Sequence, residues 1–226
     1  MTLKQLLAAT TLVAASPAFS ATLFSDTFSP QQSGWTISAV PGSQFLGRFS
    51  DQPGANIVAS SVGLNVAASA GAGTLRFNLL AFDTLDGPNI FCCQDTLTVK
   101  LNNTTLTTGQ FSAFYSSQGS IVSPVPGITA TAVYVGDVSL LQAPNAEVRA
   151  RSYQVDVSGF NLLSGMNTFS FQYSSLQSFG DESWGLDNVT VTGTEPGAAV
   201  VPVPGAALLL ATGLAGFGFA ARRRKA

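Results

Sequence analysis

The sequence predicts an all-β fold, a jelly-roll-like or lectin-like β-sandwich over residues 21–195 of the 226-residue chain. Apolar and polar residues alternate with a period of two in this region, and Gly, Pro, Asn and Ser recur between the alternating stretches. No twelve-residue window there carries the apolar stripe of a helix. About ten or eleven short strands over such a length are typical of a sandwich of this kind.

The clearest strand patterns lie at residues 96–101, 168–173 and 189–192. In the second of these, Phe169 and Phe171 share one face and polar residues occupy the other, as expected of a half-buried strand. Both phenylalanines are therefore predicted to be core residues.

Asn102 and Asn103 separate the strand at 96–101 from a second alternating stretch at 104–107. Asn tolerates the positive φ that a tight turn requires, so the pair predicts a β-hairpin. Further strands are predicted at 22–28, 34–38, 45–49, 56–66, 74–84, 111–116, 128–140 and 147–158.

Composition argues against several classes of function. The chain has no histidine, which removes the commonest general base and the commonest zinc ligand. Between residues 21 and 201, five cations face twelve carboxylates, a net charge of −7. Such an acidic domain is a poor partner for nucleic acid, and we expect none. We also expect no enzymatic activity.

Residues 1–20 have the pattern of a secretory signal peptide. Lys4 precedes an apolar stretch from Leu6 to about Ala15, and the small residues Ala18 and Ser20 indicate cleavage after Ser20. The alternative is a membrane anchor, but about ten apolar residues are too few to span a bilayer. We therefore expect export by the Sec machinery.

The C-terminal segment has three parts. A Pro- and Gly-rich linker at 196–204 is followed by an apolar run at 205–221 and a basic tail at 222–226. The apolar run is near the short limit for a transmembrane helix, and the basic tail predicts a cytoplasmic end. The alternative, a buried C-terminal helix, fits poorly because four cations close the run.

This tail resembles the PEP-CTERM sorting signal in its VPLPA-type variant, with Val203 in the position of the usual Leu. The resemblance implies recognition by an exosortase, transient residence in the inner membrane, and delivery to the cell surface or exopolysaccharide matrix of a Gram-negative bacterium. The residues that carry it are Val201, Pro202, Val203, Pro204, Gly205, Arg222, Arg223 and Arg224.

Four short blocks, at 45–49, 82–87, 95–99 and 181–189, also resemble a sandwich domain found ahead of such tails. The second block has Leu85 where that domain has Trp. This resemblance implies a fold rather than an activity.

Carboxylates near the predicted terminal strands suggest a structural calcium site, because Ca²⁺ takes six to eight oxygen ligands. The candidate ligands are Asp26, Asp181, Glu182 and Asp187. The alternative is that they are solvated turn residues, since their spacing matches no EF-hand loop. No other cofactor is expected.

Two tryptophans are candidates for glycan contact. Trp184 follows two carboxylates and precedes Gly185, which suggests a partly exposed ring at the end of a strand. Trp35 is the second candidate, and the alternative for both is core packing. Carboxylate pairs can also catalyse glycoside hydrolysis, although Asp181 and Glu182 would point to opposite faces of a strand.

Cys92 and Cys93 are the only cysteines. Export to an oxidising compartment favours oxidation of the two cysteines, either to a vicinal disulfide or to a disulfide with another chain. Together these observations predict a non-catalytic surface or matrix protein that binds extracellular polysaccharide or packs within it. The alternative is a secreted carbohydrate-active enzyme of the glycoside hydrolase kind.

Overall fold

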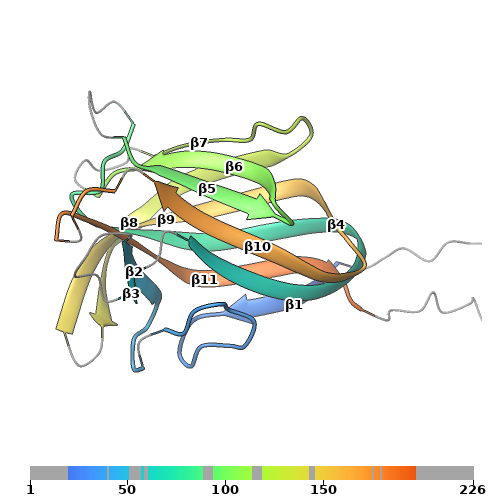
Figure 1. The fold of residues 1–226 in the computed structure, drawn as a ribbon, viewed down its shortest axis with the longest axis horizontal. Helices are drawn as coiled ribbons and strands as arrows, with labels where there is room; N and C mark the ends of the chain where they lie inside the picture. The colour runs from blue at the N-terminus through green and yellow to red at the C-terminus, as the bar shows by residue number, and fades with distance from the viewer. Residues whose placement is uncertain are drawn as a thin grey trace, which may run out of the picture. The chain divides into compact units, whose positions relative to one another are not determined.

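The computed structural model describes residues 20–39, 41–50, 57–58, 61–88, 94–113, 119–142, 146–174, 176–178 and 180–196 (Figure 1). These residues form strands and turns and contain no helix, so the predicted all-β class is confirmed. In chain order the strands are β1 (Ala21–Asp26), β2 (Leu46–Ser50), β3 (Ile57–Val58), β4 (Ser61–Asp83), β5 (Thr96–Leu101), β6 (Thr104–Phe111), β7 (Gly119–Val122), β8 (Thr129–Gln142), β9 (Ala146–Leu162), β10 (Gly165–Ser174) and β11 (Glu182–Thr194).

The strands form one curled sheet with two halves that share β4. Residues 61–68 of β4 pair with β10, which continues the sheet through β5 and β6 to β7. The later part of β4 lies between β11 and β9, and β8 pairs with β9. The described pairs are antiparallel except for the short β2–β3 pair.

A single 23-residue strand β4 therefore replaces most of the two strands predicted at 56–66 and 74–84. The Ala- and Gly-rich stretch between the two predicted strands continues β4 from one half of the sheet to the other. A Cβ atom on Gly73 would lie only 2.6 Å from the ring of Phe160. The small residue is needed for this close approach, not for a turn.

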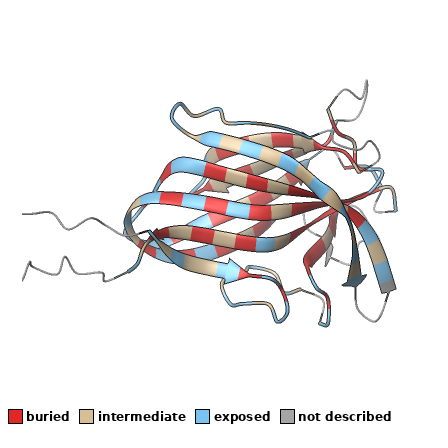
Figure 2. Ribbon diagram, turned by 180° about the vertical axis from the view of Figure 1, so that it is seen from behind, coloured by how far each residue is buried: buried red, intermediate tan, exposed pale blue. Residues whose placement is uncertain are grey.

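The two halves pack face to face over an aromatic core. The ring of Phe77 on β4 lies 5.2 Å from that of Phe171 on β10, and Phe111 on β6 lies 5.1 Å from Tyr153 on β9. Figure 2 shows buried and exposed residues alternating along these strands. Phe169 and Phe171 are both fully buried, which confirms the core prediction.

The Asn-Asn hairpin is confirmed. Asn102 and Asn103 have φ values of 48° and 68° and connect β5 to β6. The Asn102 side chain also accepts a hydrogen bond from the backbone N–H of Thr168 at 2.9 Å, and donates one to Asn167 at 3.0 Å. The turn therefore also ties β10 to the end of this hairpin.

The remaining strand predictions differ in accuracy. Those at 22–28, 45–49, 128–140 and 147–158 correspond to β1, β2, β8 and β9 with shifted ends. The predicted strand at 34–38 is wrong, because it forms only one bridge, between Trp35 and Leu64. Of the stretch at 111–116, Phe111 ends β6, and residues 114–118 lie outside the described part. Strand β7 was not predicted.

The two terminal predictions lie outside the described residues. Of the predicted signal peptide, only Ser20 is described, and residues 1–19 are not. Of the predicted linker, apolar run and basic tail, only Pro196 is described, and residues 197–226 are not. Cys92 and Cys93 also lie outside the described ranges. Within those ranges, we find no helix with the length and apolar character needed to cross a bilayer.

Candidate functional site

Trp184, the leading candidate for glycan contact, is buried. Its exposed fraction is 0%, and its ring packs against Phe49 at 4.8 Å and Tyr173 at 5.6 Å. The prediction of a partly exposed ring is therefore wrong. The reason is that β11 is a central strand, in which Trp184 pairs with Phe49 of β2 on one side and with Ala81 of β4 on the other. A sugar has no access to this ring.

Trp35 is only partly buried and packs against Phe28 at 5.4 Å and Phe171 at 6.1 Å. Its Nε1 donates a hydrogen bond of 2.9 Å to Asp26. Glycan contact at Trp35 stays a prediction.

Asp26 is buried and accepts three hydrogen bonds. Besides the indole of Trp35, the backbone N–H groups of Phe28 and Gln32 donate to it at 2.7 and 2.8 Å. Phe28 has a positive φ of 56°, an uncommon conformation for an aromatic residue. The carboxylate therefore holds the loop after β1 in shape.

The four proposed calcium ligands are not brought together. Glu182 and Asp187 are both on β11, where five residues span about 16 Å. Asp181 lies beside Glu182 at one end, where it accepts a hydrogen bond from Thr84. Asp187 lies near Asp26. Burial, and to a smaller extent the charge of Asp26, raise the pKa of Asp187 to about 6. A single ion cannot contact all four, so the set as predicted is wrong.

Calcium binding by the remaining pair, Asp26 and Asp187, stays a prediction. Asp187 accepts hydrogen bonds from the backbone and side chain of Asn188 at 2.7 and 2.8 Å. Among the residues that the structure describes, no three acidic or cysteine side chains form a group that could hold a metal.

A second group of carboxyl groups is buried where β11 begins. Asp95 is 0% exposed and Glu182 is 1% exposed. Asp95 accepts a hydrogen bond of 2.7 Å from the backbone N–H of Asp86, and Glu182 accepts one from the backbone N–H of Gln177. The other oxygen of Asp95, Oδ1, has no partner among the described residues.

Burial, together with the nearby Glu182 and Asp86 carboxylates, raises the pKa of Asp95 to about 8 against the opposing backbone hydrogen bond from Asp86. Burial also raises the pKa of Glu182. The buried hydroxyl of Tyr173 has its pKa raised by burial first and then by Asp95. At neutral pH this region therefore contains a protonated carboxyl group. Both Asp95 and Glu182 are closed to solvent.

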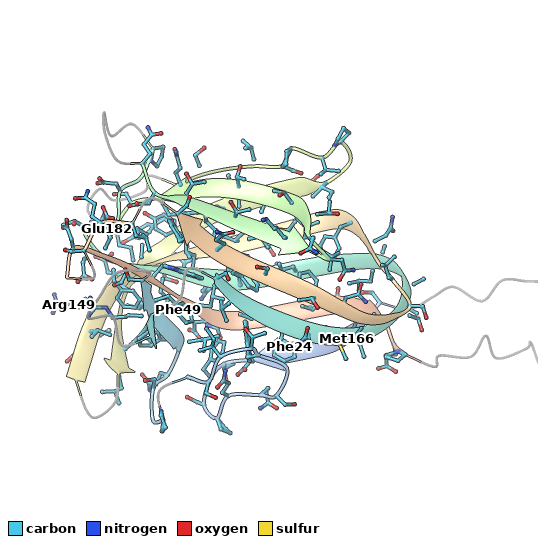
Figure 3. The ribbon with its side chains drawn as sticks, viewed as in Figure 1. Phe24, Phe49, Arg149, Met166 and Glu182 are labelled. Atoms are coloured by element: carbon cyan, nitrogen blue, oxygen red, sulfur yellow. The ribbon has the colours of Figure 1, made fainter. Side chains whose placement is uncertain are left out.

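An open pocket of about 650 Å³ is lined by residues of β4, β8 and β9 and by Arg48 of β2. Figure 3 places Arg149 at the same end of the sheet as Glu182. We call this pocket the arginine pocket. Its charged residues are Arg48, Asp83, Asp137, Arg149 and Arg151.

Strand register brings the arginine pocket together. Arg149 and Arg151 are two residues apart on β9 and therefore share one face. Across β8, Asp137 pairs with Arg151 and Ser139 pairs with Arg149, while Ala81 of β4 is opposite Arg151 on the other side. Ala81 also lines the pocket.

Arg48 and Asp83 form one wall of the arginine pocket. The Arg48 guanidinium lies 5.3 Å from the centre of the Phe82 ring and forms an ion pair with Asp83. Its Nε donates to Ser183 Oγ at 3.0 Å, and that hydroxyl donates to Asp83 at 2.9 Å. This network fixes the position of the guanidinium group.

On the opposite wall of the arginine pocket, the arginine side chains have fewer hydrogen bonds and ion pairs. The Nε of Arg151 lies 3.5 Å from Asp137, which also accepts a hydrogen bond of 2.7 Å from the Tyr134 hydroxyl. The Nη1 of Arg151 is buried without a partner within the described residues. Arg149 is exposed, and no ion pair joins it to any described carboxylate.

Sequence reasoning did not identify the arginine pocket. The five cations of the domain were evident, but Arg48 is far in sequence from Arg149 and Arg151. The one local signal was the spacing of two between Arg149 and Arg151, which predicts a shared face on a strand. No protein-family model, curated protein or solved structure was found to match this chain.

Proposed function

We propose that the protein is an exported, exosortase-processed component of the cell surface or exopolysaccharide matrix, with a non-catalytic β-sandwich that binds glycan. The observation that carries the binding role is the arginine pocket, because it is open and of ligand size, with polar donors and acceptors around a small apolar wall. Export rests on the patterns at the two ends of the sequence.

The proposal includes the finer fold class, a jelly-roll-like or lectin-like sandwich. It is supported by the face-to-face packing of the two half-sheets, shown by the Phe77–Phe171 and Phe111–Tyr153 contacts. In such a fold the packed faces stabilise the domain, and the strand ends and loops are available for binding.

The non-catalytic role is supported by the burial of Asp95 and Glu182, two neighbouring carboxyl groups with raised pKa values. A glycosidase needs two carboxyl groups on either side of the scissile bond, about 5–9.5 Å apart, with access for the sugar. Asp95 and Glu182 are essentially without solvent contact, so a polysaccharide does not reach them. Asp83 and Asp137 line the arginine pocket, but both contact arginines.

The first prediction concerns glycan binding. The full-length chain in detergent micelles is expected to bind at least one class of polysaccharide on a glycan array without releasing reducing ends. Release of reducing ends would support the alternative, a secreted carbohydrate-active enzyme. Binding to no polysaccharide would contradict the binding role.

The second prediction concerns the tail. When produced in a Gram-negative host that has an exosortase, the mature chain is expected to end near Val201–Gly205, because the apolar run and Arg222–Arg224 are transient sorting elements. Intact-mass spectrometry measures the end directly.

The matched control is the same host lacking its exosortase, in which the chain should keep residues 205–226 and stay in the membrane fraction. Recovery of the uncleaved chain from both hosts would show that the segment is a permanent anchor. Oxidation of Cys92 and Cys93 stays a prediction.

A further inference from the structure

We infer that the arginine pocket binds the carboxylate of a uronic acid residue in an acidic polysaccharide. The inference rests on the proposed glycan-binding function and specifies the class of sugar. Three of the five cations between residues 21 and 201 line this one pocket, although the net charge of that region is −7.

The guanidinium of Arg149 points to an anion, because it is exposed, lines the pocket and has no ion pair with a described carboxylate. Arg151 lies on the same face two residues away. Its Nη1 is buried, so Arg151 adds positive charge to the site while Arg149 offers the open hydrogen-bond donors. Planar guanidinium groups bind a carboxylate through paired hydrogen bonds.

The carboxylates of the pocket restrict the charge of the ligand. Asp83 and Asp137 offset two of the three arginines, which leaves about one positive charge for the ligand. A monoanion matches this balance, whereas a phosphate dianion would be repelled by two nearby carboxylates. The same carboxylates can accept hydrogen bonds from sugar hydroxyl groups, so a carboxylate and hydroxyl groups on one ring fit the site together.

Arg48 is the positioning element of this site. Its network with Ser183 and Asp83, together with its contact to the Phe82 ring, holds one guanidinium in place before a ligand arrives. Arg149 has no such network and is exposed, so it can be changed without disturbing the core. It is therefore the residue of choice for a test.

The test measures binding of the full-length chain to polygalacturonate, dextran and dextran sulfate by affinity electrophoresis at low salt. The wild-type chain is expected to be retarded by polygalacturonate much more than by dextran, and the effect should weaken as ionic strength rises. Arg149→Gln is expected to weaken polygalacturonate binding about tenfold, since it removes a charge-assisted contact.

Arg76→Gln is the matched control. Arg76 is also exposed and lies on the same half of the sheet, but it pairs with Asp156 at 2.5 Å and does not line the pocket. Arg76→Gln removes the same charge as Arg149→Gln. An equal loss of polygalacturonate binding in both variants would therefore show a general charge effect and overturn the inference. Thermal melting of each variant confirms that both are folded.

The remaining outcomes separate the two proposals. Binding to dextran that Arg149→Gln leaves unchanged would overturn the uronate inference but keep the glycan-binding function. Equal, Arg149-dependent binding to dextran sulfate would overturn the selectivity for a carboxylate. Binding to none of the three polymers would overturn the inference, and the glycan array would then decide the broader proposal.

Discussion

Replacing Trp184 by alanine is expected to lower the free energy of unfolding by about 3–5 kcal/mol, the usual cost of emptying a buried aromatic site. Trp184 is fully buried between Phe49 and Tyr173, so its loss leaves a cavity that these neighbouring rings cannot fill without moving. Urea denaturation of the full-length chain, followed by circular dichroism, measures the effect.

Phe171→Ala provides the comparison, because Phe171 is equally buried and contacts Phe77 in the same core. We expect similar losses for the two variants. Trp184→Phe should cost much less, since it keeps an aromatic ring and removes the buried Nε1, which has no partner in the described part of the chain. A loss below about 1 kcal/mol for Trp184→Ala would contradict the burial that the structure shows.

The fold was predictable where local pattern decides it. Period-two alternation identified β5, β10 and the end of β11, and the Asn102–Asn103 turn followed from the tolerance of Asn for positive φ. The same reasoning failed at β4, because Gly is common both in turns and where a strand approaches a bulky ring closely. Gly73 beside Phe160 is the second case.

The candidate site was much less predictable, because its residues come together through long-range pairing. Glu182 looked like a turn carboxylate, since nothing near it in sequence indicates that it is buried in a region shared with Asp95. Arg48 reaches Asp83 only through the pairing of β2 and β4 with opposite edges of β11. The composition showed that the domain has few cations, but it did not show that Arg48, Arg149 and Arg151 line one pocket.

The buried carboxyl group of Asp95 predicts an unusual pH dependence of stability. Its pKa is raised from an ordinary 3.8 to about 8 in the folded protein, so between these values the folded state holds a proton that the unfolded state lacks. The stability that this group contributes is fully present below pH 3.8 and is lost as the pH rises toward 8. The slope is at most about 1.4 kcal/mol per pH unit.

The diagnostic window is pH 6 to 8. Asp187, whose pKa is raised to about 6, adds a loss of stability of the same sign that lies mostly below this window and fades by about pH 7. We therefore expect the free energy of unfolding, measured by urea denaturation at each pH, to fall between pH 6 and 8 in the wild-type chain. A flat profile in this window would show that Asp95 does not hold its proton in the folded protein at neutral pH.

Asp95→Asn is expected to remove this loss and to make the protein more stable than wild type at pH 8. The asparagine keeps an oxygen that can accept the 2.7 Å hydrogen bond from the Asp86 backbone, but it carries no charge to bury. Asp156→Asn is the control, because it removes the charge of a partly exposed carboxylate paired with Arg76. If the two variants keep the same dependence on pH, the loss arises elsewhere in the protein.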